Sequence, residues 1–166
     1  MSILISESES EPITTADVKA WAKVENSDED SLISSLITSC RREVESYTKN
    51  VLRPQVWRTK YIAETIKNRF YSPRISASSV VVTVDGDTIT DYLFNEVTGC
   101  LRLNNNYSND ELIVIEWTMA TALSSLAPLT QALKDLVTYR FYNRGSYDYL
   151  PAHVVSVLNQ YRVFFV

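Results

Sequence analysis

The chain has 166 residues, of which 45% are hydrophobic and 22% charged, and its net charge is −4. That length suits one globular domain, or one domain with an inserted subdomain, and it can bury a core without disulfides. The three glycines are isolated, which excludes the glycine clusters of phosphate-binding and dinucleotide-binding loops. One histidine and two separate cysteines exclude the common zinc sites and a CxxC redox motif. We therefore expect no enzyme activity, no metal and no cofactor.

The start of the chain is predicted to be a flexible tail followed by a short helix. Residues 1–12 are polar and acidic, which is typical of an unstructured segment. Thr14 and Asp17 form a capping-box pattern, which predicts a helix over about 15–23. The residues expected to face inward on this helix are Val18, Trp21 and Ala22.

An amphipathic helix over about 28–50 is the clearest predicted element. The acids Asp28, Glu29 and Asp30 suit the positive end of its dipole. Its apolar residues recur at the helical period: Leu32, Ile33, Leu36, Ile37, Cys40, Val44 and Tyr47. Arg41 and Arg42 fall on the other faces. The thiol of Cys40 lies on the apolar stripe, so we expect it to be inert.

Residues 55–118 predict an antiparallel β subdomain of five or six short strands. Gln55–Ile62 alternates in polarity, Ser79–Val84 is β-branched, and Asp85-Gly86 has the chemistry of a tight hairpin turn. The other strands are expected at about 87–90, 92–94, 100–103 and 112–118. The polar segment 104–110 is expected to be a loop.

Two further amphipathic helices are predicted over about 129–143 and 151–161. Pro128 and Pro151 suit their first turns. The expected fold class is therefore α+β: a small helical bundle interrupted by an antiparallel β subdomain, with residues 13–166 forming a single domain. No basic segment followed by an apolar core opens the chain, so we expect a soluble protein of a reducing cytoplasm.

The charge is segregated along the chain. Residues 1–30 carry eight acids and two lysines, a net charge of −6, whereas residues 41–74 carry nine bases and three acids, a net charge of +6. This pattern fits a solvated surface, or a surface that meets an acidic partner such as nucleic acid or a neighbouring subunit. A pI near 5.0 argues against a dedicated DNA-binding domain.

Aromatic residues gather around Arg140 and Arg144, which fits either helix packing or a protein interface. The segment Val163–Val166 is apolar and β-prone. It is expected either to fold back on the core or to dock into a partner, by strand addition for example. His153 is expected at the surface or in packing.

Several blocks of the sequence resemble the head–tail connector, or head-completion, proteins of tailed bacteriophages, in the longer members that carry a β insertion. The N-terminal blocks that carry this resemblance are Ile13–Val24, Ser27–Ile37, Arg42–Thr48 and Leu52–Trp57. The C-terminal blocks are Pro128–Val137, Tyr142–Arg144, Leu150-Pro151 and Gln160–Arg162. The blocks follow the order and spacing of the family. The acidic start of the chain and the β insertion match poorly.

The resemblance implies a non-enzymatic virion protein at the neck, assembled in the host cytoplasm. Copies would form a ring, usually of twelve, beneath the portal protein, around the genomic double-stranded DNA, and would dock the next neck or tail protein. No membrane is implied. By resemblance the portal anchor is the C-terminal tail: Tyr161, Arg162, Val163, Phe164, Phe165 and Val166.

Ring closure requires one face of a subunit to meet a different face of the next. The candidate residues for this contact are Asp28, Glu29, Asp30, Arg41, Arg42, Arg140 and Arg144. The candidate loop residues facing the DNA channel or the next tail protein are Asn104, Asn105, Asn106, Tyr107 and Asn109.

Two alternatives remain open at this point. One is a DNA-binding accessory protein that uses the basic segment 41–74 with Trp57 and Tyr61. The other is a different neck or tail ring protein, such as a stopper or a tail terminator.

Overall fold

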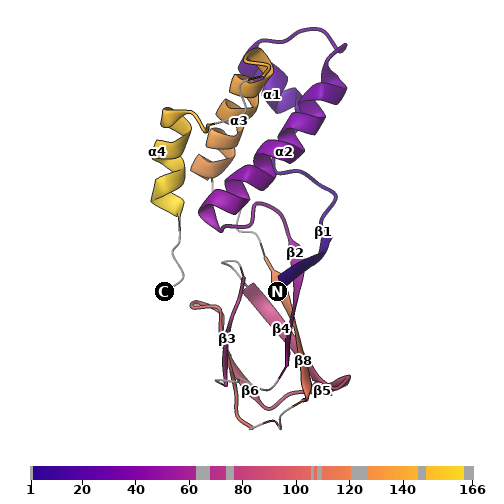
Figure 1. Ribbon diagram of the computed structural model, residues 1–166. Helices are drawn as coiled ribbons and strands as arrows, with labels where there is room; N and C mark the ends of the chain where they lie inside the picture. Colours follow the sequence, from indigo (N-terminus) through magenta and orange to yellow (C-terminus); the bar gives the residue numbers. More distant parts are fainter. Residues whose placement is uncertain are drawn as a thin grey trace. The chain divides into compact units, whose positions relative to one another are not determined.

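The computed structural model describes residues 2–62, 68–73, 77–105, 107, 110–120, 127–145 and 149–162. The chain forms two compact units. The helical unit comprises Glu9–Arg53 and Ala122–Val166, and the β unit comprises Met1–Ser8 and Pro54–Thr121. Figure 1 shows the helices of the first and the strands of the second. The described residues form helices and antiparallel sheets, which confirms the α+β class.

The helical unit contains all four predicted helices. Their bounds are Thr15–Ala22 for α1, Asp30–Thr48 for α2, Ala127–Tyr142 for α3 and Ala152–Tyr161 for α4. The capping box at α1 is present: Thr14 Oγ1 accepts from the backbone N–H of Asp17, whose carboxylate accepts from that of Thr14 at 2.8 Å. These hydrogen bonds hold the pKa of Asp17 below its usual value, because they stabilise the charged form.

The apolar stripes of the four helices meet in one core. Its fully buried members are Val18, Ile33, Val44, Leu52, Leu129, Leu133, Leu136, Val137 and Leu158. The expectation that Trp21 faces inward is wrong, because its side chain is 53% exposed. α1 is only eight residues long and buries Val18 and Ala22, so the face that carries Trp21 is left to solvent.

A buried ionic network lies beside this core and contradicts the sequence prediction for Arg41. Its side chain is fully buried rather than placed on an outer face of α2. Its Nε donates to Glu11 at 2.7 Å and its Nη1 donates to Glu45 at 2.8 Å. The other carboxylate oxygen of Glu45 accepts from the backbone N–H of Leu52, and Arg53 pairs with Glu11 at 3.3 Å. Two cations and two carboxylates thus neutralise one another inside the helical unit.

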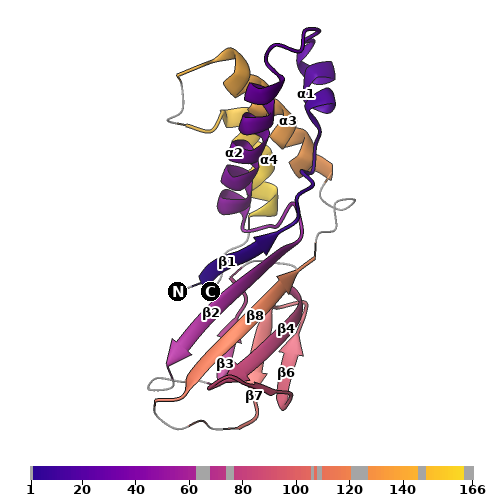
Figure 2. The ribbon, with the colours of Figure 1, turned by 90° about the vertical axis from the view of Figure 1, so that its right-hand side faces the viewer.

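Within its described residues, the β unit forms two antiparallel sheets. The five-stranded sheet has the order β1 (Ser2–Glu7), β2 (Gln55–Ile62), β8 (Leu112–Met119), β4 (Ala77–Val84) and β5 (Asp87–Ile89). Figure 2 shows β1, β2, β8 and β4 side by side. The three-stranded sheet has the order β3 (Arg69–Tyr71), β7 (Cys100–Leu103) and β6 (Tyr92–Asn95).

The two sheets share aromatic contacts, which hold the β unit together. Tyr61 of β2 contacts Phe70 of β3 with ring centroids 4.7 Å apart, and Phe94 of β6 contacts the buried Trp117 of β8 edge-on. Burial raises the pKa of the Tyr61 hydroxyl, since the charged form is poorly solvated there.

The hairpin prediction at Asp85-Gly86 is confirmed. These two residues connect β4 to β5 and both have positive φ, as a two-residue turn of this kind requires.

Two strands depart from the sequence prediction. The flexible tail expected over 1–12 is wrong for Ser2–Glu7, because these residues form β1 and pair antiparallel with β2. β3 was not predicted, because three residues are too few for an alternating pattern to register. Both strands are defined by their pairing partners rather than by their own sequence.

We expect Arg41→Met to lower the free energy of unfolding by about 3–5 kcal/mol, because it leaves the buried Glu45 carboxylate without its cation and removes one of the two cations that pair with Glu11. Urea unfolding followed by far-UV circular dichroism measures this. Arg42→Met is the matched control, since Arg42 is exposed on the same helix and should change stability by less than about 1 kcal/mol. Equal effects of the two substitutions would contradict the role of the network.

Candidate interaction surfaces

The end of α4 is fastened to the end of α2. The side-chain amide of Asn50 donates to the carbonyl of Tyr161 at 2.7 Å, and the Tyr47 hydroxyl donates to Asn159 at 2.7 Å. The guanidinium of Arg162 lies 4.8 Å from the centre of the Tyr47 ring, a cation–π contact. We call Tyr47, Asn50, Asn159, Tyr161 and Arg162 the C-terminal root. It fixes the point from which the chain continues into 163–166.

Of the predicted portal anchor, the structure describes only Tyr161 and Arg162. Tyr161 and Arg162 belong to the C-terminal root, where the carbonyl of Tyr161 and the guanidinium of Arg162 contact α2 residues or the turn after them. Val163, Phe164, Phe165 and Val166 lie outside the described residues.

Exposed aromatic side chains gather where α1 and α3 end. Trp21 lies beside Ala22, whose carbonyl accepts a 2.6 Å hydrogen bond from the hydroxyl of Tyr142, and the Tyr142 side chain is itself 61% exposed. Phe141 packs edge-on against Tyr142, and Arg144 lies over the Phe141 ring and pairs with Glu29. We call Trp21, Tyr142, Arg144 and Glu29 the aromatic corner. Tryptophan, tyrosine and arginine are the residue types most enriched at protein interface hot spots.

The predicted subunit contacts fall into two groups. Asp28, Arg42 and Arg144 are exposed, and Glu29 and Asp30 are half-buried in ion pairs with Arg144 and Lys19. The prediction that Arg41 and Arg140 contact a neighbouring subunit is wrong, because both side chains are buried within the chain. Arg140 donates to both carboxylate oxygens of Glu43, at 2.9 and 2.8 Å, so its charge is used within the helical unit.

Sequence reasoning missed Trp21 and Tyr142 as members of one surface. They are 121 residues apart in the chain, and only the hydrogen bond to Ala22 shows that they are neighbours.

The polar loop after β7 is partly described. Asn104 donates through its side chain to Asp91 at 2.6 Å, Asn105 is exposed and Tyr107 is half-buried. Asn106 and Asn109 lie outside the described residues. The loop is therefore tied at Asn104 to the residue that precedes β6.

Three further features would bear on function in the part of the chain that the structure describes: metal-ligand clusters, membrane-spanning helices and an accessible histidine. There, no three His, Cys, Asp or Glu side chains are grouped as metal ligands would be. None of the helices seen in the described ranges has the length and apolar character needed to cross a bilayer. His153 is exposed in the first turn of α4, as expected.

Comparison with known proteins identifies the family. A sequence model of the family described as "Head completion protein" matches residues 11–164, which is most of the chain. This chain belongs to the Head completion protein family. No curated protein matches it.

Solved structures share the fold of this head completion protein. A chain of the "virion of native gene transfer agent (GTA) particle" has a TM-score of 0.79 at 13% identity, over 100% of this chain and 97% of that one. The "neck of empty GTA particle computed with C6 symmetry" gives 0.79 at 15% identity with the same coverage. The "neck of native GTA particle computed with C12 symmetry" gives 0.71 at 14% identity, over 99% and 97% of the two chains.

We expect the two thiols of this head completion protein to differ in reactivity. Burial raises the pKa of the Cys40 thiol to about 12, so almost no thiolate forms near neutral pH, whereas Cys100 is partly exposed. Ellman's reagent should modify one thiol per native chain quickly and the second only on unfolding. Rapid labelling that persists in Cys100→Ser would show that Cys40 is accessible.

Proposed function

We propose that this head completion protein is a head–tail connector. Copies form a ring beneath the portal, usually of twelve, extend the path of the genomic DNA and dock the next neck or tail protein. Family membership supports a structural rather than an enzymatic role. Likeness in fold to chains of GTA neck structures with C6 and C12 symmetry is compatible with a ring of twelve in the virion neck.

The C-terminal root is the observation that carries this proposal. A segment that anchors one protein to another binds more tightly when its starting point is already fixed, because less conformational freedom is lost on binding. Asn50 and Tyr47 hold Tyr161, Asn159 and Arg162 in this way. In this proposal Tyr161 and Arg162 position the anchor, and Val163–Val166 supply the apolar contact with the portal.

The aromatic corner is the proposed contact between neighbouring copies. Asp28 and Asp30, on either side of Glu29, add charge beside it, and Arg42 further along α2 is a separate candidate, while Trp21 and Tyr142 supply the apolar area that a stable contact needs. The loop residues Asn104, Asn105, Asn106, Tyr107 and Asn109 remain candidates to face the channel or the next tail protein.

The alternative of a DNA-binding accessory protein required the bases of 41–74 to act together. Arg41 and Arg53 pair with Glu11 in the helical unit, and Arg58 pairs with Glu116 in the β unit. Trp57 and Tyr61 make internal contacts with Gln55 and Phe70. These pairings engage three of the nine bases of the segment within the chain, which disfavours one basic surface built from the whole segment. A stopper or tail terminator would instead bind tail tubes rather than portal-bearing heads, which electron microscopy of the two mixtures distinguishes.

Deleting residues 163–166 should abolish binding to portal-bearing heads while leaving the helical unit folded, because the C-terminal root is retained. Co-sedimentation with heads measures binding, and circular dichroism measures folding. Val97→Ser is the control: Val97 is 93% exposed in the β unit, so its loss should leave binding unchanged. Heads that still bind the truncated protein would refute the anchor.

Trp21→Ala should weaken the contact between copies by about 2–4 kcal/mol, a loss of roughly 30- to 1,000-fold in affinity, as for an interface hot spot. Its effect on monomer stability should be small, since the side chain is half exposed. Analytical ultracentrifugation and electron microscopy of rings measure the outcome, again with Val97→Ser as control. Normal ring formation by Trp21→Ala would remove the aromatic corner from the contact.

A further inference from the structure

The outer face of the three-stranded sheet carries two arginines side by side. Arg69 of β3 is directly opposite Arg102 of β7, and Leu93 of β6 is the next residue in the same row. Phe70, Leu101 and Leu103 alternate with them and are buried on the inner face. We call this outer surface the arginine face; its other members are Tyr71, Cys100 and Asn95.

The charges of the arginine face are not neutralised by the part of the chain that the structure describes. Within those ranges, neither the Arg69 nor the Arg102 side chain makes a hydrogen bond or an ion pair. By contrast, carboxylates pair with Arg41, Arg53, Arg58, Arg140 and Arg144.

This arrangement opposes the stability of the sheet. Like charges directly opposite on neighbouring strands repel one another. No described acid shares the face: Asp91 and Glu96 lie beyond the two ends of β6, and the carboxylate of Asp91 already accepts from Asn104. A local cost of this kind is expected where a surface has a function that folding does not require.

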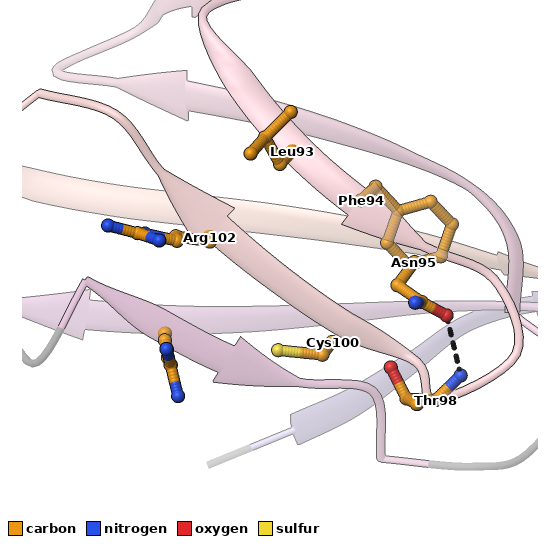
Figure 3. Close-up of a pocket in the computed structure, with 7 residues that line it drawn as sticks. Leu93, Phe94, Asn95, Thr98, Cys100 and Arg102 are labelled. Carbon is orange, nitrogen blue, oxygen red and sulfur yellow. Dashed lines mark hydrogen bonds between the residues drawn. The ribbon is translucent and has the colours of Figure 1, made fainter.

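A hollow of about 380 Å³ lies on this face, and its polar lining consists mainly of donors. Figure 3 shows Arg102, Cys100 and Asn95 along neighbouring strands, with the Asn95 carbonyl oxygen turned to the backbone N–H of Thr98. That hydrogen bond, of 3.0 Å, occupies the acceptor of Asn95 and leaves its amide N–H groups as donors. Guanidinium, amide and hydroxyl donors without a carboxylate suit an oxyanion, and guanidinium groups match phosphate in shape and charge.

We propose that the arginine face is an anion site that takes the phosphodiester backbone of duplex DNA. The inference rests on the proposed function, in which DNA passes through the ring. An exposed row of two cations can meet a backbone that carries a phosphate every few ångströms without reading its sequence. An acidic protein partner would also be expected to use an apolar core with charge at its rim, whereas here the central strand of the row carries a charge, Arg102.

The contact is weak in a single copy and adds up around a ring. Two arginines neutralise at most two phosphates, so the logarithm of affinity should fall with the logarithm of salt concentration with a slope of about −1.8 per copy. A contact of this strength restrains DNA without stopping its movement. The measurement must therefore detect weak binding at single residues.

The test is nuclear magnetic resonance of the full-length ¹⁵N-labelled protein titrated with a short duplex DNA. We expect salt-sensitive shifts at the backbone amides of Arg69, Cys100 and Arg102 and at the two arginine side chains. The double variant Arg69→Gln with Arg102→Gln should lose these shifts while the rest of its spectrum stays unchanged. Arg58→Gln is the matched control, because Arg58 is a partly exposed arginine of the same unit that already pairs with Glu116.

Three results would overturn the proposal. The first is that no added ligand shifts these resonances. The second is that inorganic phosphate shifts them but DNA does not. The third is that an acidic peptide of equal charge shifts them but DNA does not, which would point to a protein partner. Binding of the double variant to portal-bearing heads separates the two claims. If the double variant binds heads normally and the native protein shows no DNA shifts, the DNA site fails and the connector proposal stands. If the native protein shows the shifts but binds no heads, the connector proposal fails instead.

Discussion

The buried guanidinium of Arg41 organises the helical unit. An isolated charge inside a protein is strongly unfavourable, so its partners must come with it. Here Glu11, which precedes α1, and Glu45, one turn further along α2, pair with Arg41, and Glu45 in turn accepts from the backbone N–H of Leu52 after the helix has ended. Arg53 completes the set by pairing with Glu11. The network therefore fixes the entry to the helices and the chain that leaves α2, which the apolar stripe alone would leave less defined.

The end of α2 holds the C-terminal root, from which the proposed portal anchor of this head completion protein continues. Tyr47 is in the last turn of α2 and Asn50 follows it, and together they hold the end of α4. The same helix contributes Glu43, which neutralises Arg140 of α3. Internal pairing of this kind removes charge from the surface. The aromatic corner exposes Trp21 and Tyr142, and the C-terminal root fixes the start of the C-terminal segment; both features suit contacts with other proteins.

The two units use arginine in different ways. In the helical unit every arginine that the structure describes makes an interaction with the rest of the chain. In the β unit, Arg58 is paired across the strands with Glu116, whereas Arg69 and Arg102 face each other without a carboxylate among the described residues. The basic segment 41–74 is therefore divided between arginines that pair with carboxylates within a unit and at least one exposed arginine, Arg69, that does not. Arg69 belongs to this basic segment, whereas its partner on the arginine face, Arg102, lies outside it.

The sequence by itself determined the helices, the main strands and the fold class, because periodicity and capping chemistry are local properties. The stripe of α2, the box at Thr14 and the turn at Asp85-Gly86 could all be read without knowing what packs against them. Only the tertiary structure decided that Arg41 is buried, that Trp21 is exposed and that Ser2–Glu7 form a strand. The burial of Arg41 depends on a carboxylate 30 residues earlier, and strand β1 depends on a strand that begins at Gln55. Trp21 is exposed because α1 packs only one of its faces against the rest of the helical unit. Burial and pairing are properties of neighbours in space, and no local pattern specifies which neighbours those are.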